Sequence, residues 1–157
     1  MVSELKEVDI SDLLGRLEIL ANQDLIIKNI AQKLVLIKGA GGSIGSEISR
    51  QVAKKASKVI LLDSKEYSLY SIKKEIENLL PDADLYAVLG SVTYEKRIAD
   101  ICKAFAVDTV YHAAAYKHVP LVEENPFEGV FNNIIGTQAC VQAAIAVSYT
   151  HLRAHET

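Results

Sequence analysis

Short, continuously apolar runs alternate along the chain with segments in which apolar residues recur at helical spacing. Such runs are typical of strands that helices cover on both faces, and the alternation is typical of a parallel sheet with right-handed crossovers. The pattern predicts an α/β fold with a doubly wound parallel sheet, truncated after about four strands in the order 3-2-1-4. The predicted elements are a strand over 33–37, a helix over 43–55, a strand over 58–62, a helix over 66–79, a strand over 84–89, a helix over 94–105, a strand over 108–113 and a helix over 126–146.

A glycine-rich turn joins the first predicted strand to the first predicted helix. The residues from 34 to 47 read LVLIKGAGGSIGSE, with the framing glycines spaced three apart. In a Rossmann-type unit, such glycines permit a tight turn and let the backbone approach a pyrophosphate, which the free N–H groups at the helix start then bind. An ATP- or GTP-binding P-loop is excluded because Ser46 and Glu47 stand where that motif requires Lys and Ser or Thr. The turn therefore predicts a dinucleotide site, with an ordinary tight turn as the alternative; its residues are Gly39, Gly41, Gly42, Ser43, Ile44 and Gly45.

The carboxyl ends of the other predicted strands meet at the same edge of the sheet. Asp63, at the end of the second strand, is expected to accept hydrogen bonds from both adenosine ribose hydroxyls and to repel a 2′-phosphate. This favours NAD, with NADP as the alternative; a solvated strand-end carboxylate is the other interpretation of Asp63. The later strands are followed by residues that are expected to contact the cofactor, namely Ser91, Val92, Ala113, Ala114 and Ala115.

Composition narrows the class of protein further. The chain has 157 residues, half of them apolar, and a net charge of −3, which suits one domain and predicts neither a nucleic-acid partner nor an anionic membrane surface. No apolar run is long enough to cross a bilayer, and no signal peptide is recognisable, so a cytoplasmic protein is expected. Cys102 and Cys140 are far apart in the sequence and fit no metal or redox pattern, which predicts buried or idle thiols.

The two ends of the chain differ from the middle. Residues 1–30 mix acids with leucines at helical spacing and are expected to form an arm that packs on the domain at 31–147, with a docking site for an upstream domain as the alternative. Residues 148–157, SYTHLRAHET, are interpreted as a non-native tail, and their two histidines lack a third metal ligand. The fourth strand would then be an unpaired apolar edge, which predicts aggregation or partial unfolding.

Several longer motifs together resemble one family. The chain is similar to the extended short-chain dehydrogenases/reductases, and within them to the CapD-like nucleotide-sugar 4,6-dehydratases of bacterial polysaccharide biosynthesis. HAAAYKHVP is much more specific to that group than the glycine turn. The motifs that carry the resemblance are DLLGR at 12–16, the glycine turn at 34–47, LLDSKEYSLY at 61–70, HAAAYKHVP at 112–120, EENP at 123–126 and NNIIGT at 132–137.

The resemblance implies a parent enzyme that uses NAD to oxidise C4 of UDP-N-acetylglucosamine, eliminates water across C5 and C6, and returns the hydride to C6. It implies that Tyr116 and Lys117 position the sugar nucleotide, that Asn133 supports this positioning and that His118 buttresses the loop. The alternatives are that Tyr116 only covers the helix start and that Lys117 is a solvated loop cation. It places the acid, base and proton-relay residues after Val147, so no residue of this chain is assigned a catalytic role and the chain alone is expected to be inactive. It also implies a homo-oligomeric parent, anchored in some relatives by an upstream membrane domain. A nucleotide-sugar epimerase and a non-catalytic NAD-binding module are the alternatives.

One residue of the glycine turn departs from the family pattern. Lys38 stands where the family usually has Thr. A long cation at this position either strengthens phosphate binding, disturbs the turn, or extends along the surface with its amine in water.

Overall fold

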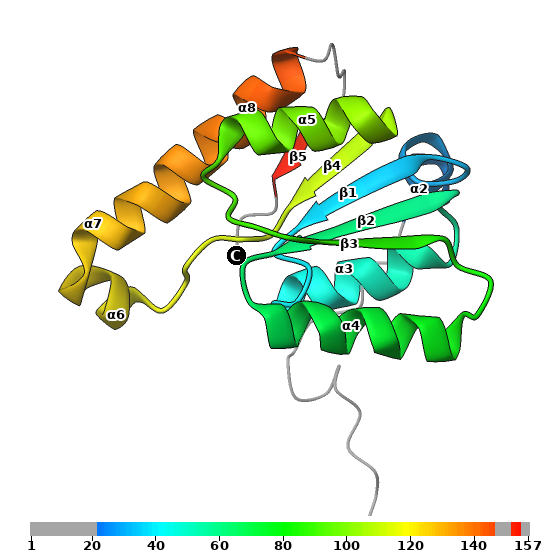
Figure 1. The fold of residues 1–157 in the computed structure, drawn as a ribbon, viewed down its shortest axis with the longest axis horizontal. Helices are drawn as coiled ribbons and strands as arrows, with labels where there is room; N and C mark the ends of the chain where they lie inside the picture. Colours follow the sequence, from blue (N-terminus) through cyan, green and yellow to red (C-terminus); the bar gives the residue numbers. More distant parts are fainter. Residues whose placement is uncertain (1–21, 147–151, 155–157) are drawn as a thin grey trace, which may run out of the picture.

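A computed structural model describes residues 22–146 and 152–154 of the chain, and these residues form one parallel sheet with helices on both faces (Figure 1). The sheet order is β3-β2-β1-β4-β5. The predicted Rossmann-type class and the order 3-2-1-4 are therefore confirmed. The strands are β1 (Leu34–Lys38), β2 (Lys58–Asp63), β3 (Leu85–Leu89), β4 (Thr109–His112) and β5 (Leu152–Ala154).

The helices form a layer on each face of the sheet. α3 and α4 cover one face and α5 and α8 the other, whereas α6 and α7 extend past the carboxyl ends of the strands (Figure 1). The long helix predicted over 126–146 is divided into α7, the π-helix η1 and α8, and α6 was not predicted. The helices are α2 (Gln23–Asn29), α3 (Ser43–Ala53), α4 (Glu66–Leu79), α5 (Glu95–Phe105), α6 (Val119–Glu124), α7 (Pro126–Gly129), η1 (Val130–Ile135) and α8 (Gly136–Ala146).

Alternate residues of the central strands supply two apolar cores. Val35 and Ile37 of β1 face the core beneath α3 and α4, whereas Leu36 faces the core beneath α5 and α8. In the second core, Ala139 and Ala143 of α8 are at most 4% exposed. Small residues let α8 lie close to the sheet, and both faces of the strands are buried, as the continuous apolar runs predict.

β5 corrects the expectation of a sheet that ends at β4. It pairs with β4 in parallel, with Val110 opposite Leu152 and His112 opposite Ala154. Three residues of the segment interpreted as a non-native tail thus complete a backbone ladder, and the predicted unpaired edge at β4 is wrong. A parallel ladder is formed by backbone N–H and C=O groups, so it does not require a strong strand pattern in the sequence of β5. The argument for aggregation from an exposed β4 therefore no longer holds.

Only part of the predicted N-terminal arm is described. Within it, the Asn22 side chain accepts a hydrogen bond from the Leu25 N–H and caps α2. At the other end of α2, the Thr109 hydroxyl donates to the Asn29 carbonyl over 2.8 Å, which ties this helix to the start of β4. The DLLGR motif, His151 and His155 lie outside the described residues.

Candidate functional site

The glycine turn has the geometry that a phosphate site requires. Gly39 has φ +76°, and a Cβ there would lie 2.5 Å from the carbonyl oxygen of Ala113. A Cβ on Gly45 would collide with the carbonyl of Gly39, so only glycine lets α3 start this close to the turn. No side chain caps α3, whose first residue is Ser43. The first N–H groups of the helix therefore remain available to an anion.

Asp63 holds the turn in place through both of its carboxylate oxygens. Oδ2 accepts from the Gly41 N–H and Oδ1 from the Lys65 N–H, each over 2.9 Å. The side chain is largely buried, with the residue 7% exposed. Each oxygen keeps a second lone pair with which it can accept from a ribose hydroxyl. Asp63 is thus a structural link between the turn and α4 as well as a candidate ribose ligand.

The carboxyl edge of the sheet carries a cleft of about 320 Å³. Its wall is formed by the loops that follow β1, β2, β3 and β4, the last of which includes Tyr116, and by Asn132 of η1. Ser43, Ile44 and Gly45 belong to the start of α3 and are not part of the cleft wall. The predicted cofactor residues that line the cleft are Gly39, Gly41, Gly42, Asp63, Ser91, Val92, Ala113, Ala114 and Ala115.

Two consecutive asparagines of η1 hold the loop after β4. The Asn133 side chain accepts from the Tyr116 N–H over 2.7 Å and donates to the Tyr116 carbonyl over 2.9 Å. The Asn132 side chain donates to the Ala114 carbonyl over 2.7 Å. Asn133 therefore holds the backbone of this loop but is not part of the cleft wall. Asn132 was not predicted as a site residue, although the Asn-Asn pair in NNIIGT is the signal that could have identified it.

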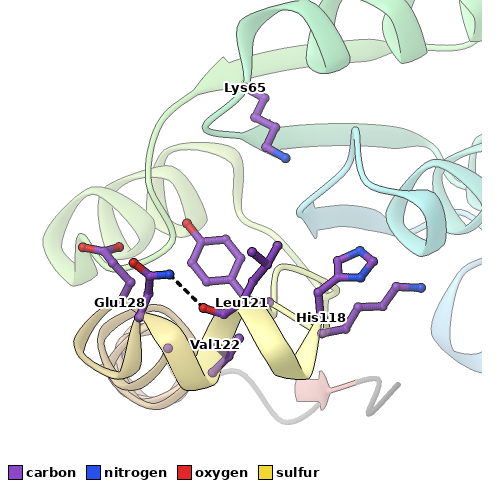
Figure 2. A pocket seen from close by; sticks show the side chains of 9 residues that line it. Lys65, His118, Leu121, Val122 and Glu128 are labelled. Atoms are coloured by element: carbon purple, nitrogen blue, oxygen red, sulfur yellow. Dashed lines mark hydrogen bonds between the residues drawn. The ribbon is translucent and has the colours of Figure 1, made fainter.

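A second cavity, of about 380 Å³, adjoins the cleft (Figure 2). Lys65 and Tyr116 belong to the walls of both spaces. Lys117, predicted to position substrate, lines the second cavity together with His118. Lys65 was not predicted as a site residue. Its place in both walls depends on how close the start of α4 lies to the loop after β4. The rest of the wall consists of Leu121, Val122, Asn125, Glu128 and Gly129.

Lys38 is buried in the core, so the interpretation of a surface lysine is wrong. It is 0% exposed, and its Nζ has no hydrogen-bond partner among the described residues. Burial lowers the pKa of this amine, while the nearby thiols of Cys140 and Cys102 favour its charged form. The Cys140 thiol is close enough to interact, but it does not have the geometry of a hydrogen bond to Nζ. Lys38 is also not part of the cleft wall, which gives no support to a phosphate-binding role.

His112 and the two cysteines surround the same region of the core. His112 lies opposite Lys38 in the sheet; its Nε2 is 3.1 Å from the Thr137 hydroxyl and its Nδ1 has no partner among the described residues. Burial, with a contribution from the Lys38 charge, lowers the pKa of His112 to about 4. Both cysteines are buried, as predicted, and neither forms a disulfide; burial raises the pKa of Cys102 to about 11. The Cys102 thiol is therefore protonated at neutral pH, and neither cysteine lines the cleft.

The described residues contain no group of three or more side chains arranged to hold a metal ion. No described helix has both the length and the apolarity that crossing a bilayer would need.

The relatives found by comparison with known proteins agree with one another on the family of this chain. The family described as "Polysaccharide biosynthesis protein" matches residues 35–152. The chain is 43% identical to the capsular polysaccharide biosynthesis protein CapD of Staphylococcus aureus over 145 residues, which cover 91% of this chain and 24% of CapD. It is 31% identical to the UDP-N-acetylglucosamine 4,6-dehydratase (inverting) of Campylobacter jejuni serotype O:2, over 71% of this chain and 32% of that enzyme. The chain thus spans about a quarter to a third of the length of these curated relatives.

Among solved structures, the fold is similar to that of DesIV, a dTDP-glucose 4,6-dehydratase of Streptomyces venezuelae solved with NAD bound. The TM-score is 0.65 at 26% identity, and the match covers 76% of this chain and 38% of DesIV.

Proposed function

Because the chain belongs to the polysaccharide biosynthesis protein family of the extended short-chain dehydrogenases/reductases, we propose that it is the NAD-binding portion of a UDP-N-acetylglucosamine 4,6-dehydratase-like enzyme. The observation that carries the proposal is the glycine turn at the start of α3, which opens onto the cleft. The relatives that act on nucleotide sugars and the NAD in DesIV support the same conclusion. We assign none of the described residues to proton transfer.

The described residues fit a dinucleotide in three respects. The turn at Gly39 and Gly42 has no side chain that would keep a pyrophosphate from the backbone, and the α3 N–H groups are free to bind it. Asp63 can accept from the adenosine ribose, and its negative charge opposes a 2′-phosphate. The alanines after β4 leave room for the cofactor against the backbone. Bound NAD would supply the hydride acceptor for oxidation of the sugar.

The loop after β4 has a positioning role in this proposal. Asn133 fixes the Tyr116 backbone, and Tyr116 separates the cleft from the second cavity. Lys117 follows directly and lines the second cavity. A sugar nucleotide held by Tyr116 and Lys117 would therefore lie next to the cofactor.

Calorimetric titration of the 157-residue chain with NAD and with NADP tests the proposal. Circular dichroism first establishes that each variant is folded. NAD is expected to bind more tightly than NADP, and Gly42→Asp is expected to abolish binding, because it places a carboxylate where the pyrophosphate would lie. Gln51→Asp, on the exposed side of the same helix, is the matched control and should bind as the wild type does. A folded wild-type chain that binds neither dinucleotide would refute the proposal.

A further inference from the structure

We propose that the open edge of β3 pairs with β3 of a second copy of this chain, in antiparallel orientation about a two-fold axis. β3 lies at one end of the sheet, and β2 is its only strand neighbour among the described residues (Figure 1). A strand with an open edge can bind a further strand through its backbone groups. β3 contains neither a charged residue nor proline, which are the usual protections of such an edge. This inference does not depend on the proposed function.

Alternate residues of β3 direct their backbone groups away from β2. The Val59 N–H donates to the Asp84 carbonyl, and the Gly90 N–H donates to the Asp63 carbonyl, so both ends of β3 are fixed relative to β2. Backbone groups of successive strand residues point in opposite directions, so every second residue between Asp84 and Gly90 faces the open edge. The N–H groups of these residues have no partner among the described residues. The edge-facing residues are Leu85, Ala87 and Leu89.

The sequence of β3 suits pairing with itself. It reads LYAVL, with Ala87 at its centre and a leucine at each end. In an antiparallel pair centred on Ala87, the two alanines exchange both of their backbone hydrogen bonds, and Leu85 does the same with the partner's Leu89. Tyr86 lies opposite the partner's Val88, and such pairs of aromatic and β-branched side chains stabilise antiparallel sheets. Tyr86 and Leu89 are 50% and 49% exposed in the single chain, so pairing covers apolar surface that is now in water.

The charges around β3 favour the antiparallel orientation. The exposed carboxylate of Asp84 precedes the strand. Beyond its end, Arg97 of α5 lies over Gly90 and donates to the Leu89 carbonyl over 3.4 Å, which leaves that oxygen a second lone pair. Pairing centred on Ala87 places Asp84 opposite the partner's Gly90 and therefore beside the partner's Arg97. The two-fold axis repeats this contact, whereas a parallel arrangement would place like charges side by side.

The contact is small, so the dimer is expected to be weak. It consists of a five-residue strand and a cavity of about 410 Å³ between β3 and α5, which leaves room beside the edge for side chains of the partner. Contacts of this size are typical of weak complexes, and a Kd of about 100 μM is expected.

Two measurements on the 157-residue chain test the pairing. Sedimentation equilibrium between about 10 μM and about 1 mM detects the dimer. Amide hydrogen exchange locates the contact. The N–H groups of Leu85, Ala87 and Leu89 should exchange more slowly as the concentration rises, because they gain hydrogen-bond partners only in the dimer.

Two charge-reversal variants add a test that a folding defect cannot imitate. Arg97→Glu and Asp84→Lys each place like charges at both contacts and should weaken the dimer about tenfold. An equimolar mixture restores opposite charges at both contacts and should dimerise as the wild type does. Circular dichroism checks the fold of each variant, because Asp84 also pairs with Lys58 over 3.0 Å. Lys54→Glu, at the C-cap of α3, makes the same change of charge away from β3 and is the control.

Four outcomes would overturn the inference. The first is a chain that stays monomeric up to about 1 mM. The second is a dimer in which the β3 amides exchange as fast as in the monomer, which would place the contact on another surface, such as the exposed side chains of Phe127 and Phe131. The third is slow exchange of these amides at every concentration, which would mean that another segment of the same chain covers the edge. The fourth is a mixture of the two variants that dimerises no better than either variant alone.

Discussion

Replacing Lys38 with methionine removes an amine that the fold encloses without a hydrogen bond. Lys38 is 0% exposed, and its Nζ has no hydrogen-bond partner among the described residues. Methionine keeps an unbranched chain of similar length and adapts readily to an irregular core. The substitution therefore removes the cost of the buried polar atom while keeping most of the packing.

The expected gain follows from that cost. A buried donor without a partner costs about 1–3 kcal/mol, so Lys38→Met should raise the free energy of unfolding at pH 7 by about 2 kcal/mol. For a chain of this size, that corresponds to a rise in Tm of roughly 4–8 °C. The gain should depend on pH. Because burial lowers the pKa of Lys38, the unfolded chain binds the proton more readily than the folded chain below the ordinary lysine pKa of 10.5. Wild-type stability is thus lost as pH falls from 10.5, and the advantage of the variant should shrink as pH rises toward that value.

Urea unfolding followed by circular dichroism, at pH 7 and at about pH 9.5, measures both effects. Lys96→Met replaces an exposed lysine and should change stability by less than about 0.5 kcal/mol at either pH. A Lys38→Met chain that is less stable than the wild type at pH 7 would refute the reasoning. That result would mean that the Cys140 thiol or a buried water satisfies the amine in solution.

Two other substitutions test neighbouring parts of the structure. His112 has its pKa lowered to about 4, so the folded chain should lose about 3 kcal/mol of stability as pH falls from about 6.5 to about 4. His112→Gln should flatten that dependence in urea unfolding, and an equally steep curve in the variant would contradict it. Asn133→Ala removes both hydrogen bonds to Tyr116 and should weaken NAD about tenfold in calorimetry, at a cost of about 1–2 kcal/mol in stability. Asn78→Ala, at an exposed position of α4, is its control. Equal NAD affinity in the two variants would show that the hydrogen bonds from Asn133 to Tyr116 do not shape the cleft.

The pattern of the sequence predicted the sheet well because its information is local. Continuous apolar runs mark strands that helices cover on both faces, and the glycine spacing marks the connection of β1 to α3. Residues at the ends of parallel strands necessarily share one edge, so Asp63, Ser91 and the alanines after β4 were correctly brought together. Family resemblance then narrowed the fold to one group of enzymes.

The failures concern features that distant contacts decide. A surface position was one interpretation of Lys38 from the sequence. Its burial could not be predicted, because it depends on how α5 and α8 cover the end of β1. β5 has no strong strand pattern of its own, and its pairing depends on the ladder that β4 offers. The second cavity depends on where α6 begins relative to Lys65. None of these could be deduced from spacing alone, because each requires the relative positions of segments far apart in the chain.

The π-helix η1 also limits how the length of this part of the chain can change. A single-residue deletion within η1 would favour the ordinary α-helical hydrogen-bond register, which is the more stable one in isolation. It would also turn everything on one side of the deletion by about 100° relative to the other side. Either the asparagines would leave the loop at Ala114 and Tyr116, or Ala139 and Ala143 would leave the core. Substitutions can accumulate in this segment one at a time, but insertions and deletions cannot, so homologues that keep this cleft should keep its length.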